Sequence, residues 1–300
     1  MRVTHRSTVT EEQIDHLGHM NVMWYAVNAT AATAAVLVEL PGWGERPYFV
    51  HDIYTRHHRE QLLGAELEVR SALLRSDESG VRIHHELVNV ATEERAATFV
   101  HRVSPIDPGG HRVAVPADAL AVASVDAIEP PDYAATRSIT LSVDLLEHAP
   151  PLAVLRARKL EMRKERRIGA DELDASGDYR TERAAGLMWG GEPLEGGEPE
   201  MLEETDDGAL IGWAIMETRI QLAAKPLEGT RIQSFGAGIA MHDKVVHRLF
   251  WAYDLDTAEP LAVFEAINLA FDVRTRRPVS FPEHHRRREE SRIHADLAPS

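Results

Sequence analysis

The chain contains no cysteine. This absence excludes disulfide bonds, thiolate nucleophiles and cysteine-based zinc or iron–sulfur sites, and it is typical of a reducing compartment. Long apolar runs are also missing. The longest uncharged stretch, 22–38, contains Asn28, Thr30 and Thr33 and is shorter than the roughly 20 apolar residues of a bilayer span. The polar start, 1–13, lacks the apolar segment of a secretory signal, so we expect a cytoplasmic protein with no membrane partner.

Basic residues are scarce relative to acidic ones. The sequence has 33 Lys and Arg against 48 Asp and Glu, a formal net charge of −15. This balance argues against generic binding to nucleic acid or to an anionic membrane surface. With 44% hydrophobic and 27% charged residues, the 300-residue chain has the composition of an ordinary globular protein and is long enough for two domains.

An Asp-x-x-Gly pattern occurs twice, at Asp15 and Gly18 and again at Asp174 and Gly177, 159 positions later. Runs of alternating apolar and polar residues begin at Gly64 and Gly229, which are 165 positions apart. The offset is six residues larger here, and we interpret the acidic stretch 190–208 as a solvated loop inserted between the two landmarks. Proline pairs frame a connector between the two copies. We therefore predict a first unit at 1–128, a connector at 129–151, a second unit at 152–282 and a charged tail at 283–300.

Each half has the same expected order of elements: a short strand, the Asp-x-x-Gly turn, a helix and several long strands. The first helix is expected at Val22–Glu39, after Asn21 as N-cap, and its apolar residues on nearly all sides predict burial. The second, at 179–189, is shorter. The expected strands are rich in Val, Ile, Leu and Phe and lie at 66–75, 81–89, 95–104, 231–241, 244–253 and 261–273. This order predicts an α+β fold in which a long antiparallel sheet wraps around a central helix, twice over, as an internal pseudo-dimer.

The first turn combines a carboxylate with the start of a buried helix. The N-terminus of a helix has unpaired N–H groups and a partial positive charge, which can polarise a carbonyl oxygen or stabilise an oxyanion. Gly18 has no side chain to keep a substrate from the backbone. Asp15 is then placed to act on the carbonyl carbon, as general base for water or as nucleophile.

This segment resembles the motif of hotdog-fold acyl-CoA thioesterases of the 4-hydroxybenzoyl-CoA thioesterase type. That motif is Asp-x-x-Gly-His-x-Asn-x-x-x-Tyr, and its positions are occupied here by Asp15, Gly18, His19, Asn21 and Tyr25. The resemblance implies a double hotdog that hydrolyses a thioester. It gives Asp15 the role of catalytic carboxylate, Gly18 and the following N–H groups that of polarising the carbonyl, and Asn21 a supporting role. For His19, a structural and a catalytic hydrogen bond are both open.

The second copy departs from this pattern, because Asp178 and Arg180 replace the histidine and the asparagine. Asp174 and Gly177 are therefore a possible second site, and we expect one competent site near Asp15.

Substrate-binding candidates flank the first turn. Met20, Trp24 and Tyr25 are expected to line the core or the pocket. Tyr54, Arg56 and His58 belong to a basic stretch that either binds the phosphates of coenzyme A or forms a solvated strand face. Adjacent histidines on a strand point to opposite faces, so the pairs at 57–58, 84–85 and 284–285 do not predict a metal site. We expect no metal or redox cofactor, with coenzyme A only as part of the substrate.

The predicted function is hydrolysis of an acyl thioester, with acyl-CoA as first choice and acyl carrier protein as the other carrier. One alternative is a hotdog dehydratase or hydratase, although 22–38 lacks the acidic residue that these enzymes carry on the helix. The other alternative is a non-catalytic acyl-CoA binding protein. The stretch 50–69 is similar to thioesterases linked to carnitine and betaine breakdown. Sheet edges could also join two chains as a homodimer.

Overall fold

The computed structural model describes residues 1–158, 160–190, 203–204, 208 and 210–299. The chain divides into two compact units: Met1–Thr136 with Arg180–Arg183, and Arg137–Tyr179 with Ala184–Ser300. Their boundary falls inside the stretch 129–151, and the C-terminal tail is grouped with the second unit. In the described part of the chain, every helix is too short or too polar to cross a membrane.

The first unit is built on five antiparallel strands. Their order across the sheet is β1-β3-β4-β5-β2, so the first strand pairs with the third and the second lies at the other edge. The bounds are β1 (Arg2–Thr8), β2 (Tyr48–His57), β3 (Glu66–Asp77), β4 (Gly80–Asn89) and β5 (Arg95–Pro105). A helix, α2 (Ala117–Val125), follows the last strand and packs against β3.

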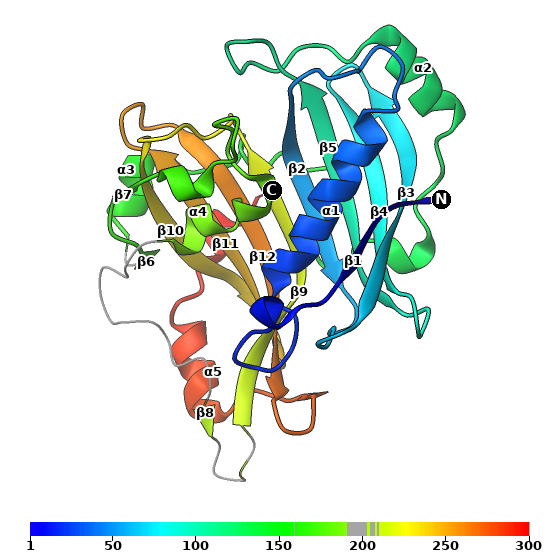
Figure 1. The fold of residues 1–300 in the computed structure, drawn as a ribbon. Helices are drawn as coiled ribbons and strands as arrows, with labels where there is room; N and C mark the ends of the chain where they lie inside the picture. The colour runs from blue at the N-terminus through cyan, green and yellow to red at the C-terminus, as the bar shows by residue number, and fades with distance from the viewer. Residues whose placement is uncertain (159, 191–202, 205–207, 209, 300) are drawn as a thin grey trace. The chain divides into compact units, whose positions relative to one another are not determined.

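The central helix α1 (Val22–Leu37) crosses one face of this sheet (Figure 1). The Asn21 side chain caps it by accepting a hydrogen bond from the Met23 N–H at 2.9 Å, which satisfies one of the unpaired donors of the first turn. Ala29 and Ala32 are fully buried, and their small side chains let the helix approach the strands closely. The helix ends two residues before the predicted end, and turns carry the chain through Pro41.

The second unit has a sheet of the same strand order, β9-β12-β11-β10, with two short strands beyond β10. Its strands are β6 (Glu161–Met162), β7 (Arg166–Arg167), β8 (Glu203–Glu204), β9 (Leu210–Leu222), β10 (Arg231–Met241), β11 (Val245–Asp254), β12 (Pro260–Asp272) and β13 (Arg277–Pro278). Among its described residues are also the helices α3 (Leu152–Arg156) and α5 (Glu283–Glu290).

The helix predicted at 179–189 is not continuous. The structure has a 3-10 turn at Thr181–Arg183 and then only four residues of α-helix, α4 (Gly186–Trp189). Glycine costs about 1 kcal/mol relative to alanine inside a helix, and glycines stand at both 186 and 190. The predicted loop at 190–208 lies largely outside the described residues.

The six strands predicted from hydrophobic alternation are present, with ends that differ by at most two residues. Two long strands, β2 and β9, were not predicted. The reason is visible in β2, where polar residues such as His51, Asp52 and Arg56 interrupt the apolar pattern. Those side chains have partners inside the fold, which a period-two pattern cannot reveal.

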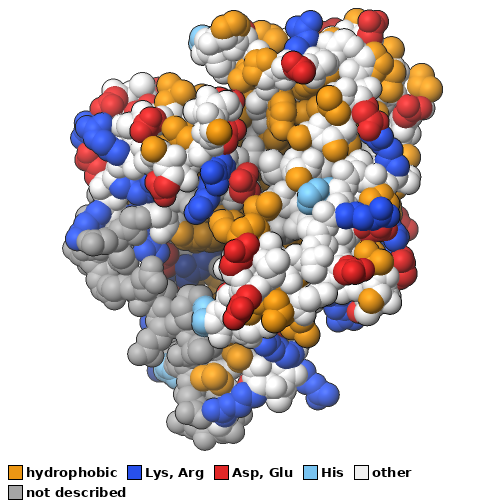
Figure 2. All heavy atoms as spheres, viewed as in Figure 1, with side chains coloured by type: hydrophobic (Ala, Val, Ile, Leu, Met, Phe, Trp, Pro, Cys, Tyr) orange, Lys and Arg blue, Asp and Glu red, His pale blue; other side chains and the backbone are white. Residues whose placement is uncertain are grey.

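Charged side chains of both signs are scattered over the face of the molecule shown in Figure 2. One network joins Arg70 to the buried Glu68 and to the exposed Glu93, at 2.8 Å in each case. The Arg70–Glu93 pair lies at the surface, where an ion pair contributes about 1 kcal/mol or less.

Candidate functional site

The Asp-x-x-Gly segment forms a closed turn at the start of α1. The Asp15 N–H donates to the His19 carbonyl at 2.9 Å, and the Gly18 N–H donates back to the Asp15 carbonyl at 3.0 Å. Ile14 and Met20 pair across the base of the turn as an isolated antiparallel bridge. These bonds fix the backbone of Asp15 directly beside the first residues of the helix.

The Asp15 carboxylate is held on both oxygens and still reaches the surface. Its Oδ1 accepts a hydrogen bond from the Leu17 N–H at 2.9 Å. Its Oδ2 lies 3.3 Å from Nδ1 of His19, and 15% of the Asp15 side chain is exposed. A carboxylate placed in this way is neither sealed in the core nor turned fully to solvent, so a substrate can meet it.

The predicted backbone donors are not all available. The N–H groups of Gly18, Met20 and Asn21 donate to the carbonyls of Asp15, Gln61 and Gln13, at 3.0, 2.7 and 2.9 Å. Among the described residues, no acceptor is found for the N–H groups of His19 and Val22. Of the N–H groups at 18–22 that were predicted to polarise the carbonyl, these two thus lack an acceptor, and one of them starts the helix.

The structure gives a reason for glycine at position 18 besides the predicted approach of a substrate, which stays a prediction. A Cβ built at Gly18 has no heavy atom of the protein within 4 Å, so packing against the protein does not require glycine here. Its φ is 82°, in the left-handed region that side chains disfavour. The turn itself needs this residue.

The predicted pocket residues of α1 lie mostly in the core. Met20 and Tyr25 are buried in the cluster beneath the helix, and the half-buried Trp24 packs against it. The Tyr25 hydroxyl donates to the Arg59 carbonyl at 3.1 Å, and burial raises the pKa of this phenol, with the negative charges of Glu60 and Asp15 adding to the effect. Tyr25 therefore anchors the loop after β2 to the helix.

Arg56 and His58 have partners in other parts of the first unit. The ring of His57 stacks edge-on against Tyr25 of α1, and neighbouring strand residues alternate faces, so Arg56 points away from the helix. Its guanidinium donates to the carbonyls of residues 133 and 135, at 2.9 and 2.7 Å. Tyr54 is buried, and His58 Nε2 lies 3.2 Å from the hydroxyl of residue 98.

Sequence reasoning missed the loop that follows β2. The Gln61 carbonyl accepts the Met20 N–H, and Glu60 Oε1 lies 3.5 Å from Nε2 of His19. The loop thus forms the second wall of the site. The sequence indicated this loop only through the repeat, because the segment before Gly64 matches the segment before Gly229. In the structure, the N–H groups of the two glycines donate to the carbonyls of Val9 and Ile168, which precede the two turns.

The second Asp-x-x-Gly turn has the same backbone bonds with different chemistry. The Asp174 N–H donates to the Asp178 carbonyl at 2.8 Å, and the Gly177 N–H donates to the Asp174 carbonyl at 3.0 Å. Burial favours the neutral acid, but hydrogen bonds from Ser176 and from the Asp178 N–H outweigh it and hold the pKa of Asp174 below its usual value. This carboxylate caps its own turn.

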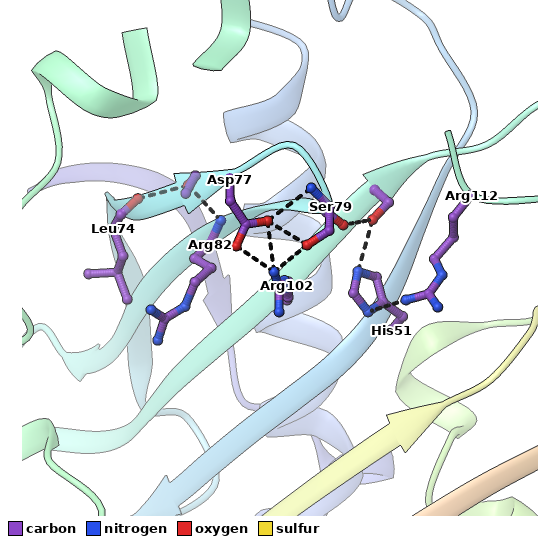
Figure 3. A network of polar contacts seen from close by, with 9 residues as sticks. His51, Leu74, Asp77, Ser79, Arg82, Arg102 and Arg112 are labelled. Carbon is purple, nitrogen blue, oxygen red and sulfur yellow. Dashed lines mark hydrogen bonds and ion pairs between the residues drawn. The ribbon is translucent and has the colours of Figure 1, made fainter. Parts of the chain in front are cut away.

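A serine–histidine pair in the first unit is not a nucleophile site (Figure 3). Arg112 donates to His51 Nδ1 at 3.0 Å, so Nε2 carries the proton and donates to the Ser104 hydroxyl at 2.9 Å. That hydroxyl is fully buried and donates to the Ser79 carbonyl at 2.6 Å. Nearby, Arg102 holds the Asp77 carboxylate in the β3–β4 hairpin.

The chain is similar to known thioesterases. Residues 9–123 match the model of the thioesterase-like superfamily. An L-carnitine dehydrogenase/betainyl-CoA thioesterase of Agrobacterium fabrum is 31% identical over 118 residues, which are 37% of this chain and 24% of that relative. The chain thus spans about a quarter of that relative's length.

Two solved thioesterase structures have a similar fold. A 12:0-ACP thioesterase from Umbellularia californica superposes with a TM-score of 0.63 at 10% identity, over 89% of this chain and 94% of the other. An acyl-ACP thioesterase from Bacteroides thetaiotaomicron gives 0.57 at 8% identity, over 88% and 96%. At such identities the likeness concerns the fold: the chain has the hotdog thioesterase fold, of the α+β class.

Proposed function

We propose that this protein hydrolyses an acyl thioester at the turn of the first unit. The observation that carries the proposal is the partly exposed Asp15 carboxylate beside the N-terminus of α1, where the N–H groups of His19 and Val22 have no acceptor in the described part of the chain. The superfamily match covers this turn and the strands around it, which supports the same reaction.

In this mechanism the thioester carbonyl oxygen lies against the free N–H groups at the helix start. The partial positive charge of that end stabilises the oxyanion that forms as the carbonyl carbon is attacked. Asp15 either removes a proton from the attacking water or attacks the carbon itself and forms an anhydride that water then opens. The products are a carboxylic acid and a free thiol, and Asn21 supports the site by capping the helix.

For the substrate we propose an acyl-CoA, with acyl carrier protein as the alternative carrier. The relative from Agrobacterium is named a betainyl-CoA thioesterase, which favours small acyl groups with a quaternary ammonium as the first to test. Coenzyme A would enter as part of the substrate, in a cytoplasmic setting.

We further propose that the chain is a double hotdog, an internal pseudo-dimer whose second unit retains the turn but not the chemistry, and that such chains can pair as homodimers. Matching hydrogen bonds support the duplication: Gly64 N–H to Val9 carbonyl and Gly229 N–H to Ile168 carbonyl are both 2.9 Å. The register of β2 on β5 recurs as that of β9 on β12.

Thiol release measured with a chromogenic thiol reagent tests the hydrolysis, and the absence of cysteine leaves no protein thiol to react. We expect turnover of at least one acyl-CoA from a panel of short, branched, aromatic and quaternary-ammonium acyl groups. Asp15→Asn should lower kcat by about 10²–10⁴-fold, while the matched variant Asp174→Asn should keep the wild-type rate. Binding without turnover on any thioester would favour the non-catalytic acyl-CoA binding protein instead.

A further inference from the structure

We propose that Glu60 is a positioning residue for this hydrolysis: through the imidazole of His19, its carboxylate holds Asp15 in the orientation that meets the thioester. The inference rests on the proposed function and adds to it a residue from outside the Asp-x-x-Gly motif. It also assigns a reason for the loss of chemistry in the second unit.

Glu60 is fixed in place from both sides. The carbonyl of the preceding residue, Arg59, accepts the Tyr25 hydroxyl at 3.1 Å, and the carbonyl of the following residue, Gln61, accepts the Met20 N–H at 2.7 Å. These hydrogen bonds on the two residues that flank Glu60 connect the loop to the helix and to the turn, and they leave the Glu60 backbone little freedom. Its side chain is 45% exposed, whereas that of His19 is only 13% exposed. The contact between Glu60 and His19 therefore leads from the surface inward to Asp15.

Oxygen atoms face both ring nitrogens of His19. Nδ1 lies 3.3 Å from Asp15 Oδ2 and 3.5 Å from the Met20 carbonyl. Nε2 lies 3.5 Å from Glu60 Oε1. Glu60 and Asp15 thus face the two nitrogens of one ring. The contact with Glu60 fixes the ring plane, and the ring in turn limits the rotation of the Asp15 carboxylate.

The second unit has a charge-reversed version of the same contact. Asp178 occupies the position of His19, 159 residues later, and Lys225 occupies that of Glu60, 165 residues later. The Lys225 ammonium lies 2.5 Å from Asp178 Oδ1. A contact between an acidic and a basic side chain at this point is therefore compatible with the fold in either arrangement. Tethering the loop to the turn requires neither a histidine nor a glutamate, so their presence in the first unit points to a role beyond tethering.

The first test replaces Glu60 alone. We expect Glu60→Ala to lower kcat by about 10- to 100-fold, with KM changed by less than about 3-fold, because a displaced catalytic group affects the reaction more than substrate binding. Glu94→Gln is the matched control. The exposed Glu94 has its Oε1 3.6 Å from Nε of Arg59, the residue that precedes Glu60 in the sequence. This variant should retain the wild-type kcat. An unchanged kcat in Glu60→Ala would overturn the proposal.

The second test transfers the ion pair of the second unit into the first, as the double variant His19→Asp/Glu60→Lys. We expect it to unfold at nearly the wild-type temperature and to have a kcat at least as low as that of Glu60→Ala. Full activity in this variant would mean that the contact is only a tether, and the positioning role would be wrong.

A third readout does not depend on turnover. In substrate-free protein labelled with ¹⁵N-histidine, the chemical shifts of the His19 ring nitrogens should change in Glu60→Ala, because this variant removes the carboxylate that faces Nε2. An identical ring spectrum in both proteins would overturn the proposal even in an active enzyme. Failure of the proposed function has a separate signature, namely no turnover of any thioester together with the expected spectral change.

Discussion

Gly18 and Gly177 adopt the same left-handed conformation at matching points of the two turns, with φ of 82° and 83°. A Cβ at either position would meet no heavy atom within 4 Å, so the cost of alanine there is conformational. We expect Gly18→Ala and Gly177→Ala each to lower the free energy of unfolding by about 1–2 kcal/mol, measured by urea denaturation. Only Gly18→Ala should also lower kcat. Equal losses of activity in both variants would contradict a single competent site.

The cap of α1 links stability to the site. Asn21 accepts the Met23 N–H, and removing this acceptor costs about 1 kcal/mol in typical helices. Asn21→Ala should therefore destabilise the protein by about that amount and lower kcat, because the Val22 N–H next to the cap loses its fixed direction. Asn21→Asp keeps an acceptor and should retain stability. A destabilised Asn21→Ala variant with wild-type kcat would show that the helix start does not contribute to the reaction.

Buried histidines make the first unit sensitive to acid. Burial lowers the pKa of His51 and of His101 to about 4, and Arg112 adds to the effect at His51. The unfolded rings titrate near 6.5, so the unfolded state binds more protons between these values, and stability is lost as the pH falls from about 6.5 to about 4. One pKa unit is worth about 1.4 kcal/mol, so each ring contributes on the order of 3 kcal/mol to this loss.

Urea denaturation of the protein at several pH values between 7 and 4 checks this expectation. His101→Asn should reduce the pH dependence, since an amide keeps a hydrogen-bonding group near Thr33 Oγ1, which lies 2.8 Å from His101 Nδ1, but does not titrate. A pH dependence identical to that of the wild type would assign the acid sensitivity to other groups.

Arg56 is expected to matter for stability first. Arg56→Ala removes the donor of two backbone carbonyls that water can still reach, and we expect the free energy of unfolding to fall by about 0.5–1.5 kcal/mol, together with faster proteolysis near residues 133–135. The KM for acyl-CoA should change by less than about 3-fold. A large rise in KM with unchanged stability would restore Arg56 as a phosphate-binding residue.

Local patterns were sufficient to predict α1 and most of the strands. Alternation with β-branched residues marks β3, β4 and β5, and the Asn21 cap with the following apolar run marks the helix. The interrupted helix of the second unit was only half predicted. Its glycines weaken the helix locally. The point at which the chain leaves helical geometry also depends on contacts with residues far away in the sequence, such as the hydrogen bond from the Ser234 hydroxyl to the Met188 carbonyl.

The turn that carries Asp15 was predicted from the motif, whereas its contact with the loop after β2 was missed. The catalytic role of Asp15 stays a prediction. The motif identifies Asp15 from residues close in sequence, whereas Glu60 reaches His19 only because β2 returns the chain to the turn. Likewise, no local signal shows that the Gly18 N–H is used inside the turn, or that Arg56 is committed to distant carbonyls. Interactions between residues far apart in the chain decide these assignments.

The Asp178–Lys225 pair also makes the second unit a built-in reference for the first. Each matching position there records another side chain that the same local backbone accepts, for example Tyr179 in the place of Met20 and Leu222 in the place of His57. A designer who wishes to alter the acyl preference can therefore read tolerated replacements from the chain itself, before any library is made.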